Sequence, residues 1–66
     1  MAYRIKQYRE LRGMTQADLA DASGVSRVMI SYLETGRSKN ASSYTLLSLA
    51  KALGTTVDNL FFDDTV

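Results

Sequence analysis

One glycine between two short, apolar-patterned segments constrains the fold of this chain more than any other feature. Leu19 and Ala20 precede Gly24, and beyond it Ile30 and Leu33 have the i, i+3 spacing of one face of a helix. Two helices that cross steeply over so short a connection need a small residue where they meet, which Ala20 supplies. They also need a residue that tolerates a left-handed backbone at the corner, which Gly24 supplies at no steric cost. The pattern predicts two packed helices joined by a sharp turn.

Capping signals stand at the start of both helices. Thr15 and Asp18 have the spacing of a capping box, and Ser26 can cap the second helix. A pair of this kind is a helix-turn-helix, whose second helix commonly lies in the major groove of DNA. A plain helical hairpin in a small bundle would bury the same apolar residues. The DNA-binding interpretation is favoured because a hairpin has no need for the polar and basic residues on the outward side of the second helix.

Composition limits the chemistry that this chain can perform. The 66 residues make one small domain, and they include no cysteine and no histidine. A thiolate metal site is therefore excluded, and the commonest general base and metal ligand is missing. Because no glycine-rich phosphate loop or carboxylate pair occurs either, we expect no enzyme, no metal and no cofactor. No apolar stretch approaches the ~20 residues of a membrane span, so we expect a cytoplasmic protein without membrane contact.

Charge is unevenly distributed along the chain, although the formal net charge is only +1. Residues 1–14 and residues 27–51 each hold four basic residues and one acidic residue, whereas residues 15–26 and 52–66 hold acidic residues alone. Basic charge therefore flanks the second helix of the motif, which suits a protein with one face on phosphate. The alternative is charge scattered only for solubility.

Apolar spacing and glycine stops predict an all-α fold of five helices. A glycine follows four of the five segments, and no proline interrupts any of them. In the first helix, Ile5, Tyr8 and either Leu11 or Arg12 have inward spacing, and the polar stretch 37–43 is expected to be a loop. The expected helices cover residues 2–12, 16–22, 27–35, 44–53 and 57–62.

Several stretches together carry a family resemblance, namely residues 8–10, 13–20, 24–26, 30–37, 46–54 and 57–61. On these stretches the chain resembles the Cro/phage-repressor type helix-turn-helix family, also called the Xre family, over essentially its whole length. The resemblance implies a compact, lambda-repressor-like five-helix domain over residues 1–66. It also implies binding of two-fold, double-stranded operator DNA as a homodimer, and regulation of transcription. Ser23 is polar where the family usually has a small apolar residue, and we expect it to loosen the turn.

Three classes of function fit this resemblance. The leading one is a sequence-specific transcription regulator, such as a phage repressor, a restriction-modification controller or a regulator on another mobile element. The second is an antitoxin that also regulates its own operon and binds its toxin away from the second helix of the motif. The third is an interaction module that has lost DNA binding, and Gln16, Arg27 and the basic loop argue against it.

The outward side of the second motif helix supplies the candidates for reading bases. Arg27 comes first in that helix, and its planar fork fits the O6 and N7 acceptors of guanine. Val28 offers methyl groups to the thymine methyl, while Ser31 and Tyr32 can bond to a base edge or to a phosphate. The alternative for Arg27 and Val28 is an ordinary exposed side chain.

A second set is expected to bind the DNA backbone. Gln16 begins a helix, where free N–H groups and the helix dipole favour a phosphate, and family resemblance implies a phosphate contact for a glutamine here. The other candidates lie at the ends of the second motif helix or in the loop after it, and they are Ser26, Thr35, Arg37, Ser38 and Lys39. A solvated loop is the alternative for Arg37 and Lys39.

Two further predictions concern structure. Family resemblance implies that Arg9 and Glu34 form an ion pair that holds the second motif helix at its angle. The apolar residues near the carboxy end exceed what a short helix needs for its own core, so we expect a two-fold dimer contact there, with closure of a small core as the alternative. The predicted dimer residues are Val57, Leu60, Phe61 and Phe62.

Overall fold

The computed structural model describes residues 3–38 and 41–61, which form five helices joined by turns, with no strand. The all-α fold predicted from the sequence is therefore confirmed. The helices are α1 (Ile5–Leu11), α2 (Gln16–Ser23), α3 (Arg27–Thr35), α4 (Ser43–Leu53) and α5 (Val57–Leu60).

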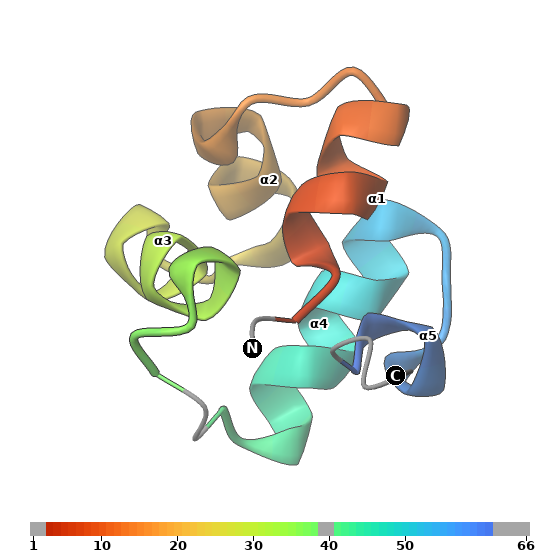
Figure 1. The fold of residues 1–66 in the computed structure, drawn as a ribbon. Coiled ribbons are helices and arrows are strands. Elements are labelled where there is room, and N and C mark those ends of the chain that lie inside the picture. The colour runs from red at the N-terminus through yellow and green to blue at the C-terminus, as the bar shows by residue number, and fades with distance from the viewer. Residues whose placement is uncertain (1–2, 39–40, 62–66) are drawn as a thin grey trace.

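The five helices enclose a small core, with α3 at one edge of the molecule (Figure 1). Helix α4 packs against α1, α2 and α5, whereas α3 packs against α1 and α2. Because its neighbours lie on one side, α3 keeps its other side turned outward, at the left of Figure 1. None of the helices in the described part of the chain is long and apolar enough to cross a bilayer.

Predicted and observed helix bounds differ most at the two ends of the chain. The helix predicted from residue 2 begins only at Ile5, and the backbone N–H of Arg4, just before it, donates to the carbonyl of Leu60 at 2.9 Å. The last helix ends at Leu60 rather than at residue 62, because Phe61 is already extended. In between, α3 has the predicted bounds, and α2 and α4 are each one residue longer than predicted.

Hydroxyl side chains cap four of the helices. The capping box predicted for α2 is confirmed, since Thr15 Oγ1 accepts from the N–H of Asp18 and the N–H of Thr15 donates to Asp18 Oδ2, both at 3.0 Å. Ser26 caps α3 in the predicted way, by accepting from the N–H of Met29 at 3.1 Å. The caps of α4 and α5 are Ser42 and Thr56.

The corner between α2 and α3 is built by Gly24 and Ser23. Gly24 has φ 75°, and no atom lies within 4 Å of the place where a Cβ would be, so the corner needs glycine for its backbone conformation and not for space. Ser23 Oγ donates to the carbonyl of Leu19 at 2.6 Å and accepts from the N–H of Val25 at 3.1 Å. The expectation that Ser23 loosens the turn is therefore wrong, because its hydroxyl ties the two sides of the turn together.

The core consists mainly of leucine and isoleucine. Neither Leu11 nor Arg12 is buried: Leu11 is 72% exposed, and the exposed Arg12, which follows α1, donates from Nε to the carbonyl of Leu53 at 2.8 Å. This bond satisfies a carbonyl at the end of α4. The large side chains that are fully buried are Ile5, Leu19, Ile30, Leu33, Leu49, Leu53 and Leu60.

We expect Leu49→Ala to lower the free energy of unfolding by about 2–5 kcal/mol, because Leu49 is fully buried and its loss leaves a cavity. A domain of this size rarely has more than about 3–5 kcal/mol to lose, so much of the variant should be unfolded. Leu47→Ala on the same helix is the control. Leu47 is 46% exposed, and its loss should cost less than about 1 kcal/mol. Urea denaturation followed by circular dichroism measures both, and equal losses would contradict the placement of the two leucines.

Candidate nucleic-acid interface

Helix α3 presents one apolar side to the core and a mixed polar side to solvent. Ile30 and Leu33 are fully buried between α3 and its neighbours. On the other side of the helix Arg27 is exposed, Val28 is 61% exposed and Tyr32 is 39% exposed. The division of α3 into an inward and an outward face is the one that the sequence predicts.

An open groove of about 500 Å³ runs along this outward face. All four residues predicted to read bases line it, and so does Gln16, which α2 contributes from its first position. The lining residues are Gln16, Arg27, Val28, Ser31 and Tyr32. The groove therefore brings together five candidates from two helices, and it offers hydrogen-bonding groups beside methyl groups and an aromatic ring.

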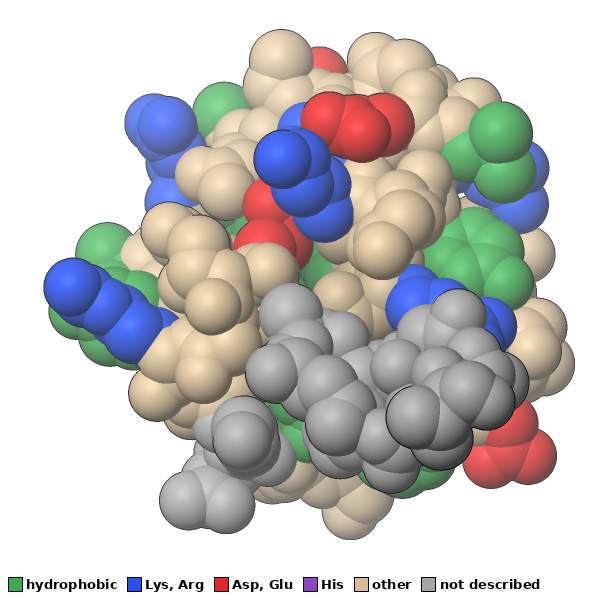
Figure 2. All heavy atoms as spheres, viewed as in Figure 1, with side chains coloured by type: hydrophobic (Ala, Val, Ile, Leu, Met, Phe, Trp, Pro, Cys, Tyr) green, Lys and Arg blue, Asp and Glu red, His purple; other side chains and the backbone are tan. Residues whose placement is uncertain are grey.

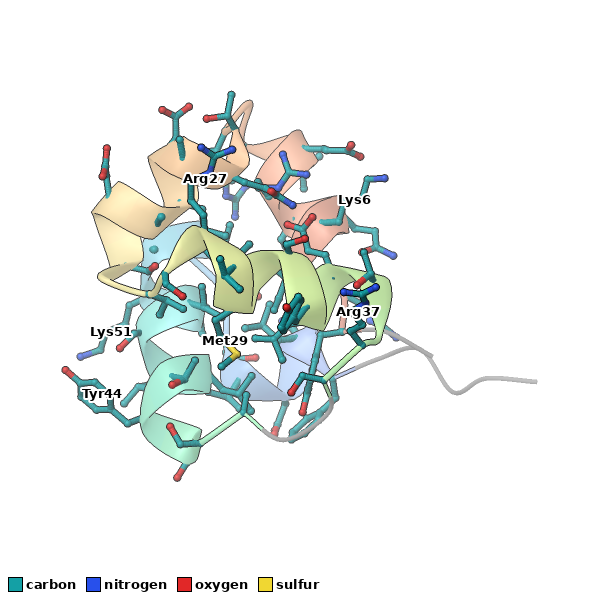
Figure 3. All side chains as sticks on the ribbon, turned by 90° about the vertical axis from the view of Figure 1, so that its left-hand side faces the viewer. Lys6, Arg27, Met29, Arg37, Tyr44 and Lys51 are labelled. Atoms are coloured by element: carbon teal, nitrogen blue, oxygen red, sulfur yellow. The ribbon has the colours of Figure 1, made fainter. Side chains whose placement is uncertain are left out.

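Basic side chains flank the outward face of α3 at both ends. In Figure 3, which looks onto α3, Arg27 lies near the start of the helix and Arg37 lies just beyond its end. Figure 2 shows Lys and Arg side chains together with hydrophobic ones at the left edge, where α3 lies. Such an edge favours an anionic partner.

The segment after α3 folds back onto the helix. The N–H of Ser38 donates to the carbonyl of Tyr32 at 3.3 Å, and the Arg37 guanidinium lies 5.5 Å from the centre of the Tyr32 ring. Thr35 Oγ1 donates to the carbonyl of Ser31 at 2.9 Å, so this hydroxyl proton is used within the helix. Lys39, the remaining predicted phosphate contact, lies outside the described residues.

A buried carboxylate joins α3 to the two helices beneath it. Glu34 is only 9% exposed, and its Oε2 lies 2.7 Å from Nε of Arg9, while its Oε1 accepts from Arg9 Nη2 at 3.2 Å. Arg9 Nη1 also donates to the carbonyl of Met14 at 2.8 Å, which fixes the connection before α2. The hydrogen bond to Glu34 raises the pKa of the Arg9 guanidinium, which therefore stays charged.

Gln16 belongs to the same network, which the sequence did not indicate. Its Nε2 donates to Glu34 Oε1 at 3.1 Å, so the first residue of α2 is bonded to the last turn of α3. One of the two amide protons is used in this bond, and Gln16 also borders the groove. No spacing rule relates these two positions, because they meet only through the packing of α2 on α3.

The residues predicted to form a dimer contact differ in their exposure. Leu60 is fully buried in the core, so it is not available to a second chain and has to be removed from the predicted contact. Val57 is half-buried against the core, and Phe61 is 46% exposed with its ring 6.1 Å from that of Tyr3. Phe62 lies outside the described residues. Phe61 is therefore the exposed aromatic residue at the end of the described part of the chain.

The groove offers hydrogen-bond donors to a bound partner. Within residues 3–38 and 41–61, no group of three acidic side chains lies close enough to hold a metal ion. The groove itself offers a guanidinium, an amide and two hydroxyls, which are donors suited to base edges and phosphate oxygens.

Comparisons with known proteins agree with this geometry. A family model described as Helix-turn-helix matches residues 5–60. The control protein C.SmaI of Serratia marcescens is 37% identical over 60 residues, which are 91% of this chain and 70% of that protein. The solved structure of SinR, the master regulator for biofilm formation, in complex with DNA has a TM-score of 0.83 at 33% identity, covering 86% of this chain and 90% of that one. The restriction-modification controller protein C.AhdI of Aeromonas hydrophila has a TM-score of 0.80 at 34% identity, covering 88% and 86%.

The capping box at the start of α2 changes the pKa of Asp18. Hydrogen bonds from the backbone and the side chain of Thr15 lower the pKa of Asp18 below its ordinary value of 3.8. Because this pKa is lower in the folded protein than in the unfolded chain, the carboxylate stabilises the fold above the unfolded pKa. That contribution is lost as the pH falls through the folded pKa.

We therefore expect Thr15→Ala to raise the pKa of Asp18 only partway, because the backbone N–H of residue 15 still donates to the carboxylate. Thr15→Ser keeps a hydroxyl and should leave the pKa low. A pH titration of the side-chain carboxyl signals by NMR measures both variants. An unchanged pKa in Thr15→Ala would show that the hydroxyl makes no contribution.

Proposed function

The chain belongs to the helix-turn-helix family of DNA-binding regulators, and we propose that it binds a two-fold operator as a homodimer, with α3 in the major groove of each half-site. The observation that carries this proposal is the open groove on α3. It is lined by Gln16 and by the four residues expected to read bases. The cytoplasm is the expected place of action, and no catalytic step is part of the proposal.

Base reading is proposed for the exposed residues at the start and middle of α3. The first residues of a recognition helix contact base edges, and Arg27 is the first residue of α3. Its guanidinium is proposed to bond to O6 and N7 of a guanine, with Val28 against a thymine methyl group. Ser31 and Tyr32 line the same groove, where their hydroxyls can bond to base edges or to phosphate.

Contacts with the DNA backbone are proposed for residues at the two ends of the interface. Gln16 keeps one amide proton beyond its bond to Glu34, and Ser26 keeps its hydroxyl proton because its oxygen acts as the acceptor in the helix cap. Arg37, Ser38 and Lys39 follow α3 and would bind the adjacent strand. Thr35 is the weakest member of this set, since its hydroxyl proton is already donated within α3.

A dimer is proposed because one such domain contacts too few base pairs for useful specificity. Two copies on half-sites one helical turn apart, roughly 34–36 Å, would give the operator its two-fold symmetry. Phe61 is the described residue best placed to carry the contact, being exposed and aromatic at the end of α5.

The kind of regulation is proposed from the relatives. C.SmaI is named a control protein, and C.AhdI is named a restriction-modification controller protein. Both resemble this chain over most of its length. We expect this chain to control the transcription of restriction-modification genes.

Substitution of Arg27 tests the docking of α3. Arg27→Ala should cost about 1–3 kcal/mol of binding to a duplex selected from random sequence, and it should relax the preference at one base pair. Lys51→Ala is the matched control, because Lys51 is exposed and basic but lies on α4 and lines no part of the groove. Mobility-shift titrations on matched and substituted duplexes provide the readout. An intact base preference in Arg27→Ala would refute the proposed docking.

Substitution of Phe61 tests the dimer surface. Phe61→Ala should shift the protein from dimer to monomer, because it removes the exposed ring proposed to lie between the two copies. Leu47→Ala is the control, since Leu47 has the same exposed fraction of 46% but lies on α4. Sedimentation velocity of the free proteins distinguishes the two states. A dimer that survives in Phe61→Ala would place the two-fold contact elsewhere.

A further inference from the structure

We infer that Tyr32 is a positioning residue for Arg37, and that its ring holds the arginine in place for a contact with the DNA backbone. The inference rests on the proposed function, because the contact needs a duplex in front of α3. It gives the ring of Tyr32 a role separate from that of its hydroxyl, which is a candidate for reading bases.

Geometry brings the two side chains together at the end of α3. The helix ends at Thr35, and Gly36 turns the chain with φ 79°, a left-handed conformation that favours glycine. The N–H of Ser38 then donates to the carbonyl of Tyr32 at 3.3 Å, so the segment that holds Arg37 is drawn back over the last turn of α3. The guanidinium consequently lies 5.5 Å from the centre of the Tyr32 ring, within the range of a cation–π contact.

The ring offers a suitable surface for this contact. Tyr32 is 39% exposed and borders the groove, while Arg37 is exposed and lies beyond the end of α3 in Figure 3. A guanidinium over an aromatic ring keeps its donors at its edge, where they can bind a phosphate. A long arginine side chain otherwise has many rotamers, and binding has to restrict them. The ring restricts them before the DNA arrives.

The free protein tests the stack without any DNA. In wild type, the ring of Tyr32 should shift the side-chain NMR signals of Arg37, because the guanidinium lies over the ring. Tyr32→Phe should keep this shift and Tyr32→Leu should abolish it. All three proteins should remain folded, since Tyr32 lies on the surface. Identical Arg37 signals in wild type and Tyr32→Leu would overturn the inference.

DNA binding tests the positioning role by a double-mutant cycle. The probes are a duplex selected from random sequence and a scrambled duplex of the same composition. Arg37→Ala should weaken binding to both and lower the salt slope by about one. Tyr32→Leu should weaken binding to both by about two- to fivefold, the factor expected for an exposed cation–π contact. In the Arg37→Ala background, Tyr32→Leu should bind the scrambled duplex no more weakly than Tyr32→Phe, which also lacks the hydroxyl.

The matched variant separates the ring from the hydroxyl. Tyr32→Phe removes the hydroxyl and keeps the ring, so any loss that it shows on either duplex should be the same in the wild-type and the Arg37→Ala background. If Tyr32→Leu weakens binding to the scrambled duplex equally in both backgrounds, the ring does not act through Arg37 and the inference fails while the proposed function stands. If wild type binds neither duplex, the proposed function itself fails, and the NMR comparison still decides whether the stack exists.

Discussion

The arrangement of the first three helices depends on one buried carboxylate. Glu34 accepts from two nitrogens of Arg9 on α1 and from the amide of Gln16 on α2, and it lies itself on α3. A buried charge is costly unless it is paired and hydrogen-bonded, so this set of donors has to stay together for the fold to be stable. The outward face of α3 is directed away from the core because its inner face is held in this way. The interface is therefore a product of the packing beneath it.

The same carboxylate also connects the core to the groove. Gln16 is bonded to Glu34 and also borders the groove. This bond fixes the start of α2 relative to the last turn of α3 at the protein surface. A carboxylate can only accept, which means that the nitrogen of the amide, and not its oxygen, faces Glu34. The orientation of Gln16 is thus determined before any partner binds. At the same end of α3, the Arg37 guanidinium lies over the Tyr32 ring, in a contact across a tight turn.

Local signals in the sequence predicted what depends on local geometry. The capping box of Thr15 and Asp18, the corner at Gly24 and the bounds of α3 all follow from residues a few positions apart. By contrast, the Arg12 side chain donates to a carbonyl at the end of α4, and the backbone N–H of Arg4 donates to a carbonyl of α5. Such contacts join residues far apart in the chain, and no spacing pattern reports them. Within the candidate site, the four groove-lining residues of α3 were predicted because they repeat with the helix, whereas the bond between Gln16 and Glu34 was not. The roles of these residues toward DNA stay predictions, since they depend on a partner.

The bond between the Arg4 amide and the Leu60 carbonyl has a practical consequence for anyone handling this protein. It brings the beginning and the end of the described chain to one place, beside α5, while α3 lies at another edge of the molecule (Figure 1). Two fluorescent probes placed on Arg4 and Phe61 would therefore lie close together in the folded protein and far apart in the unfolded chain. Energy transfer between such probes should report unfolding with high contrast.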